Sequence, residues 1–333
     1  MEDFASIKPL YFHHVFTRLL KGLLFIRRTF ALKFFNVNKP KALPVFLLIV
    51  LAIIWGSSFI LMKLGLYTSD GGELFSSWQV GALRLVFAGL ILAPVAFINR
   101  KKVSRRQLGF IALVGLIGNG IPAYMFTLAE TQIESAYAGV LNGLVPFFTL
   151  LFGVAFFRIK LKMIQFIGVA LGLGGATGLL LLQSNGESLN LIYAMFAVIA
   201  TVCYGLSVNI IHSKLSEVHP FTIASIALLF AGIPSAIFLF STDFTERLES
   251  TPGAWEGVGY IAILGVFGTA FALVLFNRLI QMTSGVFASM VTYLIPIVAV
   301  TWGWLYGENL RWEMLVFGVL ILLGIYLANQ KRK

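Results

Sequence analysis

The sequence has few charged residues for its length. Asp, Glu, Lys and Arg make up 12% of the 333 residues, whereas a soluble domain of average composition has about 25%. Hydrophobic residues make up 59%. Charged side chains cover most of the surface of a soluble protein, so this composition excludes a soluble multi-domain enzyme. The same hydrophobicity excludes an intrinsically disordered chain. A polytopic membrane protein remains.

Residues that hold metals and cofactors are also scarce. Cys203 is the only cysteine, which excludes a disulfide framework and a cysteine-based metal site. The four histidines show no HxxxH or HExxH spacing, and no phosphate-binding glycine loop ends in Lys-Ser or Lys-Thr. We therefore expect no metal, no cofactor, no nucleotide-driven pump and no enzyme.

Ten apolar stretches are long enough to cross a membrane, for which a helix needs about 20 mostly apolar residues. They lie at 44–66, 75–98, 107–129, 135–157, 163–182, 189–211, 221–241, 256–277, 284–305 and 312–329. The predicted fold is therefore an all-α integral membrane protein with ten transmembrane helices.

Basic residues in the short connecting loops indicate the orientation, because Lys and Arg accumulate on the cytoplasmic side. If the N-terminus lies inside, all but four of the 25 Lys and Arg residues are cytoplasmic or terminal; the four are Lys63, Arg84, Arg247 and Arg311. Both termini are thus expected in the cytoplasm, and the protein in the plasma (inner) membrane. The net charge of +11 follows from this topology and does not favour a nucleic-acid partner.

The two halves of the chain, 42–183 and 184–333, repeat one another. A shift of 150 residues aligns Gly115 with Gly265, Gly118 with Gly268, and Pro146 with Pro296, and a shift of 149 aligns Trp55 with Tyr204. Each half holds five predicted spans, so the second half enters the membrane from the opposite side. Inverted repeats are typical of secondary transporters, whose similar halves give two conformations of similar energy.

Several motifs resemble those of a known family. Trp55-Gly56-Ser57-Ser58-Phe59, Leu83-Arg84, the mid-helix prolines of spans four and nine, and Gly307-Glu308-Asn309-Leu310 followed by Gly318 are similar to motifs of EamA-type transporters in the drug/metabolite transporter superfamily. The resemblance implies two five-helix repeats around a central cavity and proton-linked or gradient-driven export of small metabolites. The chain departs from it at Phe157-Arg158, where the second repeat has Gly307-Glu308, and in its basic N-terminal extension.

Arg84 is the most informative candidate for substrate binding. At 1.5 Å per residue it lies about 15 Å into its span, near the bilayer centre. A central charge costs about 2.5–3.5 kcal/mol there, so it should face a partner or a wet cavity. It either anchors a substrate carboxylate or phosphate, or caps backbone carbonyls between helices.

Other candidates are polar or aromatic residues within the spans. Expected to line the cavity with Arg84 are Trp55, Ser58, Asn119, Asn142, Tyr204, Asn277 and Tyr293. Pro146 and Pro296 each remove a backbone donor in mid-helix, so we expect kinks that shape or gate the cavity. Packing alone would also account for the aromatic residues.

Charged residues near the outer ends of spans are expected to be solvated. Lys63 has a stem long enough to reach the headgroups, and snorkelling needs no function. Glu130 and Glu134 at the junction of spans three and four are interpreted as exposed loop acids. A buried carboxylate there could carry a coupling proton, but the sequence alone does not support proton coupling.

Residues 1–41 form a separate segment. Seven apolar residues between Phe12 and Phe34 fall on one helical face and basic residues on the other, which predicts an interfacial helix on anionic lipid. A targeting segment and a mis-assigned start remain open alternatives, and the glycines of span five do not decide between a monomer and a homodimer.

These observations favour a secondary transporter that exports small polar metabolites, amino acids or their derivatives, by alternating access around a midplane cavity. The alternative is a flippase for lipids or lipid-linked substrates on the same fold. An intramembrane enzyme would need a cluster of acid, base or metal-binding residues that the spans lack.

Overall fold

The computed structural model describes residues 42–68, 71–157, 188–283, 285–308 and 312–328, and isolated positions between 163 and 178. The predicted interfacial helix within 1–41 lies outside the described residues, as does the predicted fifth span, 163–182, apart from those isolated positions. Residues from Leu47 onward form one compact unit, which is the subject of the following paragraphs. Of residues 1–46, only the beginning of the first described helix, α3, is described.

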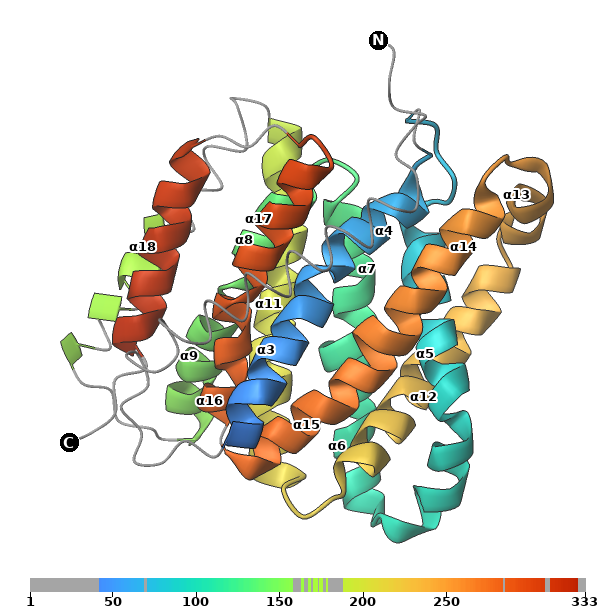
Figure 1. Ribbon diagram of the computed structural model, residues 1–333. Helices are drawn as coiled ribbons and strands as arrows, with labels where there is room; N and C mark the ends of the chain where they lie inside the picture. Colours follow the sequence, from blue (N-terminus) through green and yellow to red (C-terminus); the bar gives the residue numbers. More distant parts are fainter. Residues whose placement is uncertain are drawn as a thin grey trace. The chain divides into compact units, whose positions relative to one another are not determined.

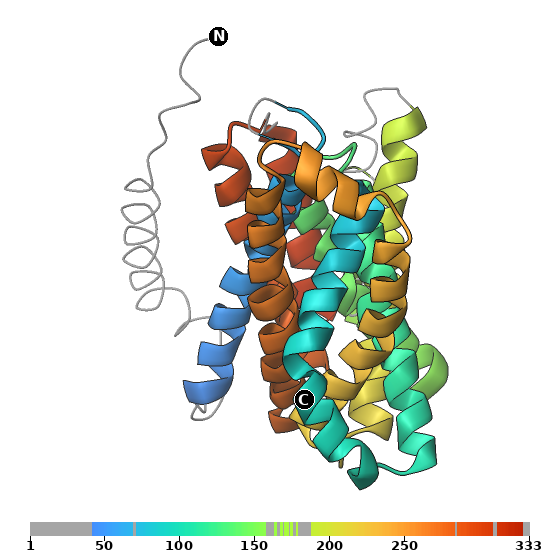
Figure 2. The ribbon, with the colours of Figure 1, turned by 90° about the vertical axis from the view of Figure 1, so that its right-hand side faces the viewer.

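The described part of the chain is helical (Figures 1 and 2), with a single isolated β-bridge between Tyr67 and Glu73. The first half contains α3 (Ala42–Gly56), α4 (Ser58–Leu66), α5 (Ser77–Asn99), η1 (Arg100–Lys102), α6 (Arg105–Gly115), η2 (Leu116–Gly120), α7 (Ile121–Ala129), α8 (Ser135–Asn142) and α9 (Val145–Phe157). The second half contains α11 (Ser188–Lys214), α12 (Pro220–Phe240), α13 (Phe244–Ser250), α14 (Ala254–Ile263), η3 (Leu264–Phe271), α15 (Ala272–Met282), α16 (Gly285–Ser289), η4 (Met290–Tyr293), α17 (Ile295–Leu305) and α18 (Trp312–Ala328).

Eight helical segments within the described ranges are long and apolar enough to cross a membrane. They coincide with predicted spans one to four and six to nine. The segment for the tenth span, α18, is apolar and has 17 residues. An all-helical membrane protein is thus borne out, whereas ten spans and two cytoplasmic termini remain predictions.

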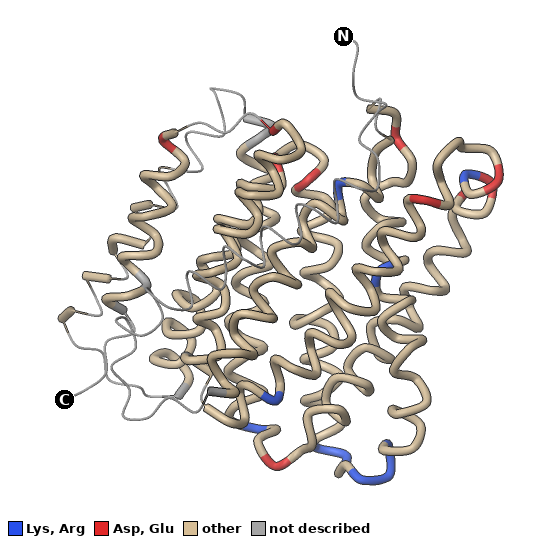
Figure 3. The backbone as a smooth tube through the Cα atoms, viewed as in Figure 1, with Lys and Arg blue, Asp and Glu red and all other residues tan. Residues whose placement is uncertain are grey.

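Most charged residues lie towards the two ends of the described helices (Figure 3). We call the end where α4, α7, α12 and α17 end the acidic end, because Glu73, Glu130, Asp243 and Glu308 lie in the adjoining turns. The opposite end, with residues 100–106, Lys214 and Arg278, is the basic end. This separation is the pattern expected for short loops on opposite sides of a membrane.

The first helices of the two halves run in opposite directions. At the acidic end the start of α5 meets the end of α12, where Gln79 Nε2 donates to Asp243 Oδ1 over 2.7 Å. At the basic end the end of α15 meets the turn that follows α11, where Gln281 Nε2 donates to the Val218 carbonyl over 2.6 Å. Hence α11 ends at the basic end, whereas α4 ends at the acidic end, as an inverted repeat requires.

Helix interruptions occur at corresponding places in the two halves. The third span contains a π-helical turn at η2, and the eighth contains the longer π-helical η3. The fourth span is interrupted between Asn142 and Val145, and the ninth passes through the 3₁₀ segment η4 before α17. Pro146 and Pro296 are therefore each the second residue of a new helix, rather than the centre of a kinked continuous helix. Proline is tolerated there because the N–H groups of the first turn have no hydrogen-bond partner within the helix, so none is lost.

Glycines allow helices of the two halves to approach at backbone contact. A methyl group on Gly115 would lie 2.5 Å from the Ala227 carbonyl oxygen of α12, and one on Gly265 would lie 2.8 Å from the Arg84 carbonyl oxygen of α5. Between α5 and α12, a methyl group on Gly232 would lie 2.9 Å from the Leu85 carbonyl oxygen and 3.4 Å from the Gly89 Cα. Small residues at such contacts drive helix association in membranes.

These contacts predict that Gly115→Ala and Gly265→Ala destabilise the protein, because the clashing neighbour is backbone and cannot rotate away. Each substitution should cost about 1–3 kcal/mol, measured by thermal unfolding in detergent micelles. The matched controls are Gly109→Ala and Gly259→Ala, also 150 residues apart, where an added methyl group meets nothing within 4 Å. Equal melting temperatures for the two pairs of variants would contradict the proposed role of the contacts.

Candidate functional site

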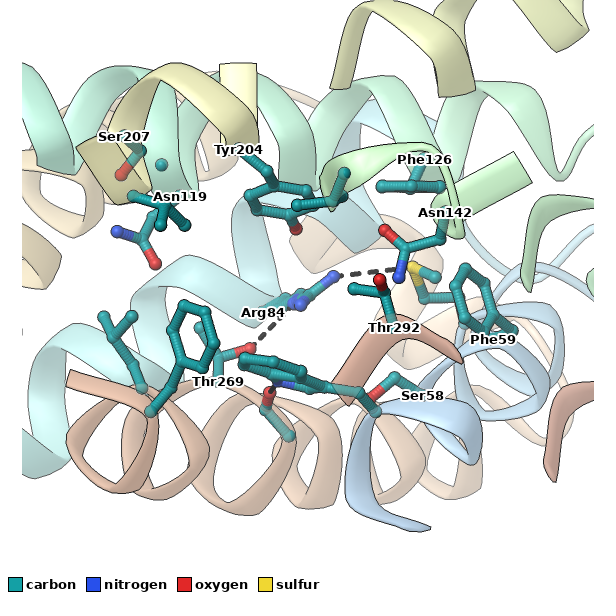
Figure 4. Close-up of a pocket in the computed structure, with 18 of the residues that line it drawn as sticks. Ser58, Phe59, Arg84, Asn119, Phe126, Asn142, Tyr204, Ser207, Thr269 and Thr292 are labelled. Atoms are coloured by element: carbon teal, nitrogen blue, oxygen red, sulfur yellow. Dashed lines mark hydrogen bonds between the residues drawn. The ribbon is translucent and has the colours of Figure 1, made fainter. Parts of the chain in front are cut away.

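A cavity lies at the interrupted segments of the two halves (Figure 4). Its volume of about 90 Å³ has room for several water molecules or part of a small solute. It is lined by Trp55, Ser58, Phe59, Met62, Arg84, Gly118, Asn119, Phe126, Asn142, Val145, Tyr204, Ser207, Val208, Ile211, Gly268, Thr269, Leu273, Phe276 and Thr292.

The lining follows the internal repeat. All lining residues except Arg84, Val145 and Leu273 fall into pairs separated by 149 or 150 positions, among them Ser58 with Ser207 and Asn142 with Thr292. Contacts repeat as well as residues. Trp55 meets Phe276 edge to face with ring centroids 4.9 Å apart, and the corresponding Tyr204 stacks on Phe126 at 6.1 Å. The cavity therefore has approximate two-fold symmetry in its wall.

The two π-helical segments place polar side chains on this wall. Each π-helical segment is accompanied by a side chain that donates to the backbone carbonyl five residues before it. Asn119 Nδ2 donates to the Val114 carbonyl over 3.4 Å, and Thr269 Oγ1 donates to the Leu264 carbonyl over 3.2 Å. These are corresponding positions, so the same local irregularity delivers Asn119 and Thr269 to the cavity.

Arg84 breaks the symmetry, because its counterpart in the second half is Ala227: Gly265 lies against the Arg84 carbonyl oxygen as Gly115 lies against that of Ala227. Its side chain enters the cavity from α5 (Figure 4), and the residue is 7% exposed. Nε donates to Thr269 Oγ1 over 2.7 Å, and Nη1 contacts Met62 Sδ at 3.6 Å. Among the described residues no carboxylate forms a salt bridge with it. The cation is oriented by a hydroxyl but not neutralised, so it can receive an anionic group.

A salt bridge at the acidic end joins the partly exposed Lys63 to the buried Glu308. Lys63 Nζ at the end of α4 lies 2.9 Å from Glu308 Oε1, and the Glu308 side chain is 1% exposed. Glu308 also accepts from the backbone N–H groups of Ser135 and Ala136, each at 3.1 Å, at the first turn of α8. Three spans are thereby joined. Lys63 is held by this pair, which corrects the interpretation that it only snorkels to the headgroups.

Glu130 is buried beside this salt bridge, at 3% exposure, so its interpretation as an exposed loop acid is wrong. The turn after α7 folds inward because Glu130 and Ile133 N–H groups continue the helical bonding to Phe126 and Ala129. Glu134 is half-exposed. Sequence pattern gave no indication of the difference, because burial here depends on the packing of elements that are distant in sequence, and local pattern does not contain that information.

The structure brings six of the sequence-predicted binding residues together in one cavity: Trp55, Ser58, Arg84, Asn119, Asn142 and Tyr204. Asn277 and Tyr293 lie elsewhere. Asn277 is fully buried in α15, and its amide N and O have no hydrogen-bond partner. Pro146 and Pro296 adjoin the interruptions that carry Asn142 and Thr292. Sequence reasoning missed Ser207, Thr269 and Thr292, although the repeat register pairs them with Ser58, Asn119 and Asn142.

Comparisons with known proteins agree with the two-repeat organisation. A model of the EamA-like transporter family matches the chain twice, over residues 42–181 and 191–330. The chain is 31% identical over 307 residues to the uncharacterized inner membrane transporter YedA of Escherichia coli, covering 87% of this chain and 94% of that one. It is 24% identical to a probable amino-acid metabolite efflux pump of Salmonella typhimurium, covering 85% and 93%. A crystal structure with 15% identity shares the fold, with a TM-score of 0.59 over 87% of this chain and 97% of that one.

The salt bridge at the acidic end predicts strong coupling between Lys63 and Glu308. Lys63→Met should destabilise the protein because it leaves the buried Glu308 carboxylate without its cation, and Glu308→Gln in the same chain should recover part of the loss. A double-mutant cycle on unfolding free energies should give a coupling of about 1–3 kcal/mol. The exposed pair Asp243–Arg247 serves as the control and should show a much smaller coupling, because solvent screens it. A coupling no larger than that of the control would contradict a strong interaction between Lys63 and the buried Glu308.

Proposed function

Because the chain belongs to the EamA-like transporter family, which makes it a transporter rather than an enzyme, we propose that it exports small metabolites that carry an anionic group. Amino acids or their derivatives are the proposed class. The observation that carries this proposal is Arg84, a buried guanidinium in the cavity with no carboxylate salt bridge within the described residues. An Arg in a water-poor site binds a carboxylate strongly because of its planar set of donors.

The rest of the cavity suits a solute with both polar and apolar parts. Ser58, Ser207, Asn119, Asn142 and Thr292 supply hydroxyl and amide groups at several positions of the wall. Aromatic rings supply the apolar part, since Trp55, Phe126, Tyr204 and Phe276 face the same space. This mixture of a few polar groups with an apolar wall is typical of small-molecule sites.

Alternating access between the two halves is the proposed mechanism. The inverted halves offer two conformations of similar energy, one open to each side. The salt bridge between Lys63 and Glu308 would close the acidic end in one of them. The proposed orientation places the basic end in the cytoplasm and the acidic end outside the inner membrane, because loops rich in Lys and Arg stay inside. The names of the two bacterial relatives support the membrane and the substrate class.

Counterflow in proteoliposomes tests this function with a panel of labelled amino acids. Saturable exchange is expected for at least one amino acid and not for its amide, which lacks the carboxylate. Arg84→Gln should raise the half-saturating concentration about 10- to 100-fold, because a hydrogen bond to a charged group contributes about 1.5–3 kcal/mol. Arg278→Gln, at an exposed arginine of the basic end, is the matched control and should leave exchange unchanged.

Three results would overturn the proposal. Exchange of amides as fast as of acids, or an Arg84→Gln variant with unchanged exchange, would remove Arg84 as the anion site. Movement of a fluorescent lipid between leaflets without any amino-acid exchange would favour the flippase alternative.

A further inference from the structure

Among the described residues of the acidic end, the carboxyl groups of Glu130 and Glu308 are buried, and the ammonium group of Lys63 pairs with one of them. Glu308 takes that cation: its Oε1 pairs with Lys63 and accepts from Ser135 N–H, and its Oε2 accepts from Ala136 N–H. Both oxygens of Glu308 are thereby satisfied. Within the part of the chain that the structure describes, Glu130 Oε2 accepts from the Ser135 hydroxyl alone, at 3.4 Å, and the buried Oε1 has no hydrogen-bond partner.

An ionised carboxylate is an unfavourable occupant of this position. Burying a charge without a partner is costly, and two carboxylates that share one buried site seldom both ionise. A protonated carboxyl group avoids the cost because it is neutral. The arrangement of donors around Glu308 and Glu130 therefore assigns the charge to the first and the proton to the second.

The titratable and charged groups that face Glu130 come from three other elements. They are Glu308 after α17, Lys63 on α4 and Arg84 on α5. Burial, and after it the neighbouring Glu308 carboxylate, raise the pKa of Glu130 well above its usual range, against the opposing effects of Lys63, the Ser135 hydroxyl and Arg84.

We propose that Glu130 is a proton-binding site whose occupation stabilises closure of the acidic end. The inference rests on the proposed transport function, since it assigns the closed conformation to one stage of alternating access. The ligand is the proton, and the site comprises Glu130 with Ser135 and the Lys63–Glu308 salt bridge.

The sign of the coupling follows from the two environments. Opening the acidic end separates Lys63 from Glu308 and admits water, which returns Glu130 towards the ordinary carboxyl pKa of about 4.3. The closed form thus holds the proton more tightly than the open form. Closure is fully stabilised below the ordinary pKa, and the stabilisation is lost as the pH rises through the higher pKa of the closed form.

Arg84 links this proton to the substrate. Its positive charge favours the ionised form of Glu130, and an anion bound at Arg84 would offset that charge. Proton binding at Glu130 and anion binding at Arg84 therefore strengthen each other, because linkage between two sites is reciprocal. A transporter loaded with an anionic metabolite would hold the acidic end closed up to a higher pH than an empty one.

The test measures the acidic end directly and without substrate. In a Cys203→Ala background, spin labels are attached at Gln132→Cys, in the turn before α8, and Tyr306→Cys, after α17, both exposed positions. Distances between the labels are recorded by pulsed electron resonance in liposomes over a series of pH values. We expect a short distance at low pH and a growing population of a longer distance as the pH rises.

Variants assign the transition to Glu130. Glu130→Gln should abolish the pH dependence, whereas the control Glu134→Gln, at the half-exposed carboxylate of the same turn, should retain it. Should Glu130→Gln fail to fold, Ser135→Ala serves instead. It removes the hydroxyl that favours the ionised form, so it should move the midpoint upward by roughly 0.5–1 pH unit. Arg84→Gln should move it in the same direction.

The outcomes separate this inference from the function on which it rests. Label distances that do not change with pH, a transition that survives Glu130→Gln, or a midpoint that Ser135→Ala moves downward would each overturn the proton site and leave amino-acid counterflow standing. Absence of counterflow with the Glu130-dependent transition intact would overturn the proposed substrate and leave the proton site standing.

Discussion

The structure depends on one constraint: in a membrane, every backbone N–H and C=O group needs a partner from the protein itself. Continuous helices meet this requirement, and most of the described chain consists of them. The exceptions are the π segments η2 and η3 and the interruptions before Pro146 and Pro296. All lie beside the cavity, where side chains and an enclosed polar space can satisfy the groups that a helix would have paired. The irregular backbone and the candidate site are therefore one feature.

Symmetry supplies the wall of the cavity, and a single residue supplies its chemical direction. A duplicated sequence places equivalent hydroxyls and rings on opposite sides, so the empty space by itself does not distinguish one orientation of a solute from the other. Arg84 does, because its counterpart in the second half, Ala227, carries no charge. Thr269 holds the guanidinium through Nε, which leaves the Nη groups on the side of Tyr204, Asn142 and Thr292 (Figure 4).

Much of this arrangement could be predicted from the sequence. Apolar stretches gave eight spans that the structure describes, and the 150-residue register together with the depth of Arg84 indicated the residues of the cavity. The same register also predicts Thr269 and Thr292, because they stand 150 residues after the predicted cavity residues Asn119 and Asn142. Burial of Glu130 could not be predicted, because it arises from the packing of elements distant in sequence, and local pattern contains no information on that packing. The prediction that Asn277 lines the cavity failed because a polar residue in a span can also lie behind the cavity wall, and sequence does not distinguish the two positions.

The glycine contact between α5 and α12 has a mechanical consequence. Gly89 and Gly232 bring the two main chains together without an intervening side chain, so no change of side-chain rotamer can alter the distance between α5 and α12 at this contact. Two helices packed in this way are expected to move as one rigid unit. Arg84 lies on α5, about 1.4 helical turns from Gly89, and therefore moves with this unit. An anion bound at Arg84 should stay nearly fixed relative to α5 and α12 while the other helices tilt.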